Sequence, residues 1–121
     1  SELVDNCLAK NLKKTINILN ENNFSIEDSI AIIRTFLAKA KRIVKLQEEI
    51  QKSKNIDEAI SNYRPPVFWK DKEILKKQIL HWPLDKIKFL IEKISTTELL
   101  IKKNSSNSIN ILSDFIITQT N

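Results

Sequence analysis

Apolar residues recur at every third or fourth position along most of the chain, which is the period of an α-helix. Two short helices are predicted at the start, one over about residues 2–10 and one that begins at Leu12 and ends at the asparagine-rich stretch 20–23. Asparagine favours turns and helix ends, so it separates helices here. The apolar positions that define the two helices are Leu3, Val4, Cys7 and Leu8, and then Leu12, Ile16 and Leu19.

The clearest element is a long helix over about residues 26–52. Ser25 followed by Asp28 resembles a capping box, with acidic residues in the first turn. Two apolar lines follow this helix and together make a stripe wider than a surface helix requires. We therefore expect the helix to be central, and we expect its second line to contact a partner protein. The first line is Ile26, Ile30, Ile33, Leu37, Ala40 and Val44; the second is Ile32, Phe36, Ile43 and Ile50, of which Phe36, Ile43 and Ile50 are the candidate partner interface.

The second half of the chain also reads as helices. Asn55 begins a short one, and Arg64-Pro65-Pro66 ends it, because a residue before proline is pushed away from helical geometry. A helix starting at Pro66 carries Phe68 to Trp82, and another runs from Pro83 through Ile94. Residues 97–103 either continue that helix or form a separate turn, residues 104–108 form a polar loop, and a last helix contains Ile109, Leu112, Phe115 and Ile116.

No stretch alternates with period two, so strands are not expected. The pattern predicts an all-α fold, a compact bundle of about five to six helices, in which residues 1–121 form a single domain. The chain begins at Ser1 without a methionine and with an apolar pattern already under way, so we expect a domain taken from a longer protein.

The sequence contains no glycine. Glycine supplies the positive φ angles of tight hairpins and the backbone of phosphate-binding loops. A P-loop and a dinucleotide-binding motif are therefore excluded. The 12 asparagines tolerate the left-handed backbone region and are expected to supply it at helix ends.

The chain has a net charge of +5 and one cysteine, Cys7. The positive charge permits contact with nucleic acid or with an acidic partner. A lone cysteine forms no intramolecular disulfide and suits a reducing compartment. No apolar run is long enough to span a membrane, and we expect no membrane partner.

Candidate catalytic chemistry is weak. His81 is the only histidine and forms no zinc site with one distant cysteine; a partly buried helix histidine is the simpler interpretation. Cys7 would need a histidine base and an orienting group to act as a nucleophile. The carboxylate pairs Glu48-Glu49 and Asp57-Glu58 fit solvated faces and helix capping. We expect no catalytic residue, no metal site and no cofactor.

Basic and aromatic residues occur together around the proline pair. Arg64, Trp69 and Lys70 are candidate nucleic-acid-binding residues, since bases stack on rings while cations contact phosphates. The alternative is that Phe68 and Trp69 are core residues and the cations only keep the surface hydrated. Both can hold if Phe68 points inward and Trp69 outward. Further basic residues lie on the long helix, at Lys39, Lys41, Arg42 and Lys45, and after the prolines, at Lys72, Lys76 and Lys77.

Several segments, taken in order, resemble the C-terminal domain of the bacterial DNA polymerase III delta subunit. They cover nearly the whole chain. Arg64-Pro65-Pro66-Val67-Phe68-Trp69-Lys70 is similar to the Arg-Pro-Pro-aromatic form of alphaproteobacterial members, and Glu98-Leu99-Leu100-Ile101-Lys102 is similar to a Glu-Leu-x-x-Lys signature. The other segments are residues 37–46 on the long helix, 56–60, and 84–94.

The resemblance implies a clamp-loader subunit whose helical C-terminal domain joins those of the other subunits in a pentameric collar. The implied partners are the ATP-binding tau/gamma-type subunits and delta-prime. The sliding clamp would be reached only through an N-terminal part that nothing in this chain matches. Template DNA would pass near Trp69, with Arg64 and Lys70 on phosphates. Ser105 stands where some members carry an aromatic residue, which argues against a second stacking platform.

Two hypotheses follow. The leading one is a non-catalytic collar domain of the delta subunit, which assembles the clamp loader that places the sliding clamp on DNA during replication, at the nucleoid-associated replisome in the cytoplasm. The alternative is a stand-alone basic helical module that binds single-stranded nucleic acid.

Overall fold

The computed structural model describes all residues, 1–121, and is built of helices only. The all-α prediction is confirmed, with seven α-helices rather than five or six, and with 3₁₀ turns at Trp69–Asp71 and Ser105–Asn107. The helices are α1 (Glu2–Leu8), α2 (Leu12–Glu21), α3 (Ile26–Ser53), α4 (Ile56–Asn62), α5 (Lys72–His81), α6 (Leu84–Lys103) and α7 (Ser108–Thr120).

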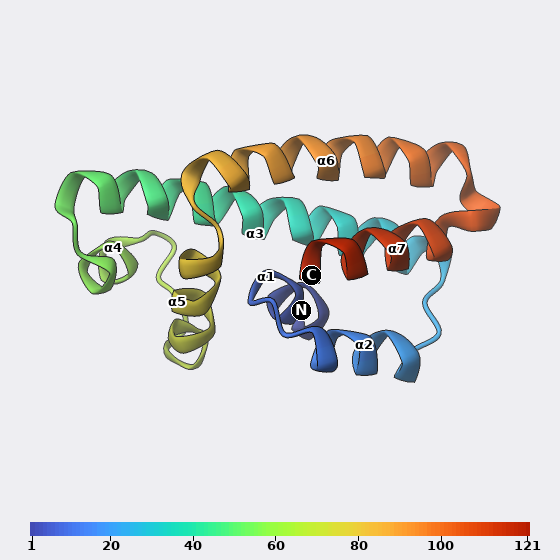
Figure 1. The fold of residues 1–121 in the computed structure, drawn as a ribbon, viewed down its shortest axis with the longest axis horizontal. Coiled ribbons are helices and arrows are strands. Elements are labelled where there is room, and N and C mark those ends of the chain that lie inside the picture. The colour runs from blue at the N-terminus through green and yellow to red at the C-terminus, as the bar shows by residue number, and fades with distance from the viewer.

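The two longest helices, α3 and α6, lie side by side and antiparallel along the molecule (Figure 1). α3 has 28 residues and spans about 42 Å at the standard rise. The predicted capping box is present: the Ser25 hydroxyl accepts from the Asp28 amide, and the Asp28 carboxylate accepts from the Ser25 amide at 2.9 Å. α3 contacts five other helices, which confirms its central place.

α6 runs without interruption to Lys103, so residues 97–103 continue the helix rather than forming a separate turn. Glu98 connects α6 to α3, since its carboxylate pairs with Lys102 at 2.8 Å and with Arg34 at 3.5 Å. The hydrogen bond from Lys102, followed by the charge of that residue and the contact with Arg34, lowers the pKa of the Glu98 carboxyl.

The segment after the prolines differs from its prediction. Pro66 does not begin a helix; the chain stays extended at Phe68, makes a 3₁₀ turn at Trp69–Asp71, and α5 begins only at Lys72. Two aromatic residues are therefore left outside any α-helix. Trp82 also lies beyond the end of α5, where Gln47 of α3 donates to the carbonyls of Ile79 and Trp82.

Left-handed backbone is supplied by lysine rather than by asparagine. Lys10, after α1, has φ 61°, and Lys54, after α3, has φ 57°. For a residue with a Cβ atom, this backbone conformation is less stable than the right-handed one by roughly 1–2 kcal/mol. The chain accepts this cost at two helix ends because it has no glycine to use there.

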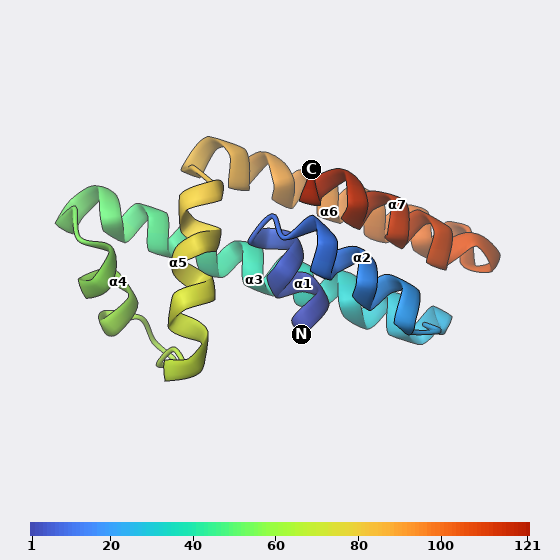
Figure 2. The ribbon, with the colours of Figure 1, turned by 60° about the horizontal axis from the view of Figure 1, so that its bottom comes forward.

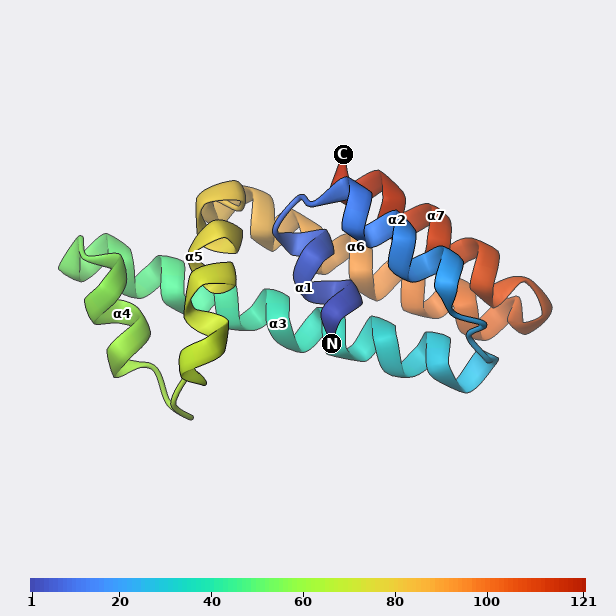
Figure 3. The same cartoon turned by 90° about the horizontal axis from the view of Figure 1, so that it is seen from below.

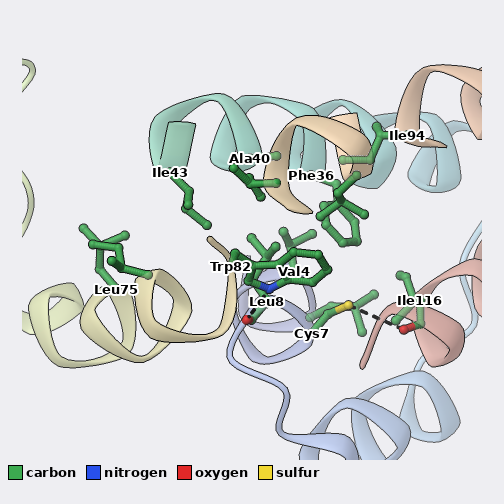
Figure 4. Packing of buried hydrophobic residues seen from close by; sticks show 14 of the residues in the cluster. Val4, Cys7, Leu8, Phe36, Ala40, Ile43, Leu75, Trp82, Ile94 and Ile116 are labelled. Atoms are coloured by element: carbon green, nitrogen blue, oxygen red, sulfur yellow. Dashed lines mark hydrogen bonds between the residues drawn. The ribbon is translucent and has the colours of Figure 1, made fainter. Parts of the chain in front are cut away.

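The core is one continuous cluster of 20 buried apolar residues, and α1 lies at its centre. Val4, Cys7 and Leu8 of α1 point among residues of α3, α5, α6 and α7 (Figure 4), and Leu3 of α1 is also buried in the cluster. Figures 2 and 3 show α1 in front of α3, and α2 packs against α1 and α7. The indole of Trp82 donates to the carbonyl of Leu8 at 2.8 Å.

The predicted partner interface on α3 is wrong for two of its three residues. Phe36 and Ile43 have no exposed surface, since α1, α6 and α7 cover this side of α3 within the chain. The Phe36 ring lies 5.7 Å from that of Phe115. Ile50 is half-buried against the same core. The wide stripe serves intramolecular packing on two sides.

None of the helices is both long enough and apolar enough to cross a membrane.

The burial of Phe36 predicts a large loss of stability on truncation. Replacing Phe36 with alanine should lower the free energy of unfolding by about 3–5 kcal/mol, because a fully packed ring leaves a cavity. The matched control is Leu80→Ala, at a side chain 72% exposed, which should change stability by less than about 0.5 kcal/mol. Urea unfolding followed by circular dichroism measures both. Equal effects would contradict the placement of Phe36.

Candidate functional site

Two large aromatic side chains project from the segment between α4 and α5. Phe68 is 57% exposed and Trp69 is 69% exposed, with their ring centroids 6.0 Å apart. The interpretation of this pair as core residues is therefore wrong for both. Tyr63 and Val67, both half-buried against the core cluster, anchor the segment. An exposed aromatic pair of this size is available to stack on a flat ligand.

Two cations of the same segment, Arg64 and Lys70, differ in the contacts they already make within the chain. The Lys70 ammonium lies 5.4 Å from the centre of the Trp69 ring. Arg64 is exposed, yet its Nη1 donates to the carbonyls of Ser61 and Tyr63 at the end of α4. Arg64 thus stabilises a helix terminus as well as presenting charge. The structure brings the three predicted residues, Arg64, Trp69 and Lys70, into one exposed segment.

The same segment forms one wall of a hollow of about 350 Å³ against α3. Arg42 lines it, and its Nε is buried without a hydrogen-bond partner. Lys39 also lines the hollow but is paired with Asp5 of α1. Of the cations that the sequence placed on α3, Arg42 and Lys39 line this hollow, and the exposed Lys45 lines a second one together with Tyr63 and Arg64.

Lys76, one of the basic residues that follow the prolines, has a structural partner instead. Its ammonium is 2.7 Å from the Asp57 carboxylate of α4 and 3.7 Å from Glu73. The hydrogen bond to Asp57 raises the pKa of Lys76. This exposed pair links α4 to α5 rather than facing the aromatic pair.

The residues with catalytic potential are not arranged as a site. Cys7 is fully buried and donates weakly to the Ile116 carbonyl at 3.5 Å. Burial raises its pKa to about 11, so the thiol is protonated at neutral pH and is a poor nucleophile. His81 is exposed at the end of α5, rather than partly buried as expected. No group of three or more His, Cys, Asp or Glu side chains could hold a metal ion.

A second surface, which the sequence did not reveal, is a groove between α6 and α7 with a volume of about 640 Å³. Its apolar lining comes from Phe89 and Leu100 of α6 and from Ile111 and Phe115 of α7. Phe89 is 57% exposed and Leu100 is 46% exposed. We call this surface the α6–α7 groove; Figure 2 shows the two helices that form it.

A smaller hollow adjoins the groove where α7 ends, and shares Phe89, Lys93 and Gln119 with it. Three lysines, Lys10, Lys86 and Lys93, line this lysine hollow, and no carboxylate does. The signal in the sequence was the spacing of Phe89, Lys93 and Leu100, which falls on one face of α6. The sequence analysis assigned no role to that face.

Comparisons with protein-family models, with curated proteins and with solved structures found no match to this chain.

The buried thiol predicts a pH effect on stability. The pKa of Cys7 is about 11 in the fold against an ordinary value of 9.0, so the unfolded chain loses this proton first as pH rises. The stabilisation is complete below pH 9 and is lost between about pH 9 and 11, on the order of 2–3 kcal/mol. Urea unfolding of wild type and of Cys7→Ala across this window should show a stability difference that shrinks with pH. If the free energies of unfolding of the two proteins changed with pH in parallel, the raised pKa of Cys7 would be contradicted.

Proposed function

We propose that this chain is a non-catalytic assembly domain, equivalent to the collar domain of the DNA polymerase III delta subunit in a replicative clamp loader. Its partners would be the ATP-binding tau/gamma-type subunits and delta-prime, at the replisome in the cytoplasm. The observation that carries the proposal is the apolar surface that α6 and α7 leave uncovered. A lone bundle gains nothing from exposing it, whereas exposed apolar patches commonly mark protein interfaces.

Most of the segments that resemble the delta subunit lie on three helices of the fold. Residues 37–46 lie on α3, residues 56–60 on α4, and residues 84–94 and 97–102 on α6. Glu98 and Lys102 of the Glu-Leu-x-x-Lys signature form an ion pair that also reaches Arg34 of α3. This ion pair connects α6 to α3.

A second role, contact with single-stranded DNA, is favoured by the exposed Phe68–Trp69 pair. Base stacking on an aromatic ring is tolerant of sequence, and Lys70, Arg64 and Arg42 supply charge for the phosphates. Within a collar this segment would meet the template strand. As a stand-alone module it would bind single strands unaided, which is the alternative function.

The assembly role predicts incorporation into a complex. When the chain is mixed with the remaining clamp-loader subunits of its own organism, size-exclusion chromatography with light scattering should show one copy entering the assembly. Phe36→Ala serves as an unfolding control. A chain that stays monomeric beside all partners at tens of micromolar would contradict the proposal.

The nucleic-acid role predicts that Trp69→Ala weakens binding to a single-stranded oligonucleotide by about 1–3 kcal/mol, because one stacked base is lost. Fluorescence anisotropy measures the affinity, and log affinity should fall linearly with log salt. Leu80→Ala, an equally exposed truncation at the other end of α5, is the control and should bind as wild type does. Unchanged binding by the Trp69→Ala variant would leave this ring without a role in DNA contact.

A further inference from the structure

The α6–α7 groove has the form of a helix-binding surface. α6 contributes Phe89 and Leu100, and α7 contributes Ile111 and Phe115, so apolar side chains lie along both walls. Ile111 and Phe115 lie about one turn apart and Phe89 and Leu100 about three turns apart, so each pair falls on one face and follows the period of its helix. An amphipathic helix laid along such a groove can insert side chains at the same period.

The outer rims of the groove are acidic. Glu92 on α6 and Asp114 on α7 occupy equivalent places, each three residues after an apolar wall residue, Phe89 or Ile111. Both are exposed, and neither forms an ion pair. A nucleic-acid strand in the groove would bring its phosphates against these carboxylates, which disfavours it.

The lysine hollow at the end of the groove has the opposite charge. None of Lys10, Lys86 and Lys93 lies within ion-pair distance of a carboxylate. Two of the three are already held in place: Lys10 donates to the Gln119 carbonyl at 2.9 Å and lies 4.4 Å from the Trp82 ring, and Lys93 lies 4.6 Å from the Phe89 ring. Held cations without counter-charges favour an incoming carboxylate, because little side-chain entropy remains to be lost.

We propose that the α6–α7 groove binds an amphipathic helix of a partner protein, with carboxylates at one end of that helix seated on Lys10, Lys86 and Lys93. The apolar stripe of the partner fills the space between Phe89, Leu100, Ile111 and Phe115. Its flanks are uncharged or basic where they meet Glu92 and Asp114. This charge pattern fixes the direction in which the helix lies. The groove proposal rests on the proposed function only in taking the partner to be another subunit of the assembly.

Two synthetic peptides of about 18 residues, or about five helical turns, test the proposal directly. Both carry a leucine stripe at every third or fourth position; one ends in three glutamates and the other in three lysines. The full chain should bind the glutamate peptide at least about tenfold more tightly at low salt, by fluorescence anisotropy. Lys86→Glu/Lys93→Glu should reverse this order, and Phe89→Ser/Leu100→Ser should weaken both peptides.

The matched control is Lys88→Glu/Lys103→Glu, which makes the same charge change at exposed lysines of α6 that do not line the groove or the lysine hollow. It should keep the preference for the glutamate peptide, and circular dichroism should show all variants folded. If neither peptide binds, or if both charge variants behave alike, the proposal is wrong. It is also wrong if Lys86→Glu/Lys93→Glu loses binding to a single-stranded oligonucleotide while neither peptide binds.

Assembly with the clamp-loader subunits separates this proposal from the proposed function. If wild type and Lys86→Glu/Lys93→Glu both assemble and the peptides do not discriminate, the groove proposal fails and the assembly role stands. If wild type does not assemble but the peptide preferences hold, the groove proposal stands and the clamp-loader role fails. Self-association of the wild type that is lost in Lys86→Glu/Lys93→Glu would assign the groove to a second copy and overturn the proposed partner.

Discussion

The burial of the short helix α1 is the interaction on which the rest of the structure depends. Seven residues are too few for a helix to be stable alone in water, so α1 forms because its neighbours enclose it. In return it joins them: the Asp5 carbonyl accepts from Gln78 of α5, the Leu8 carbonyl accepts from Trp82, and Cys7 contacts the end of α7. Lys39 of α3 pairs with the Asp5 carboxylate. Helices distant in sequence are thereby fixed around one short segment.

That packing decides which apolar residues remain outside. α1, α6 and α7 take up the side of α3 that carries Phe36 and Ile43, so this helix has little apolar surface left to offer a partner. The uncovered apolar surface lies instead on α6 and α7, whose other faces are used internally. A wide apolar stripe on a helix therefore indicates that several neighbours pack against it. It does not indicate whether those neighbours belong to the same chain.

The two candidate surfaces lie in different parts of the molecule and have different chemistry. The aromatic segment, residues 67–71, lies between α4 and α5, whereas the groove is formed by α6 and α7, and α7 lies at the other end of the bundle (Figure 2). The first offers flat rings beside cations, which suits bases and phosphates. The second offers an apolar channel with acidic rims and a basic end, which suits a helix.

The sequence by itself determined the helical class, most helix boundaries and the capping box at Ser25, because these depend on local periodicity and on residues three or four positions apart. It also brought Arg64, Trp69 and Lys70 together, since they are neighbours in the chain. Only the tertiary structure decided that Phe36 and Ile43 are core, that Trp69 is exposed while Trp82 is buried, and that Lys10 meets Lys86 and Lys93. These outcomes depend on contacts between residues far apart in sequence, and periodicity along a single helix carries no information about which neighbour covers which face.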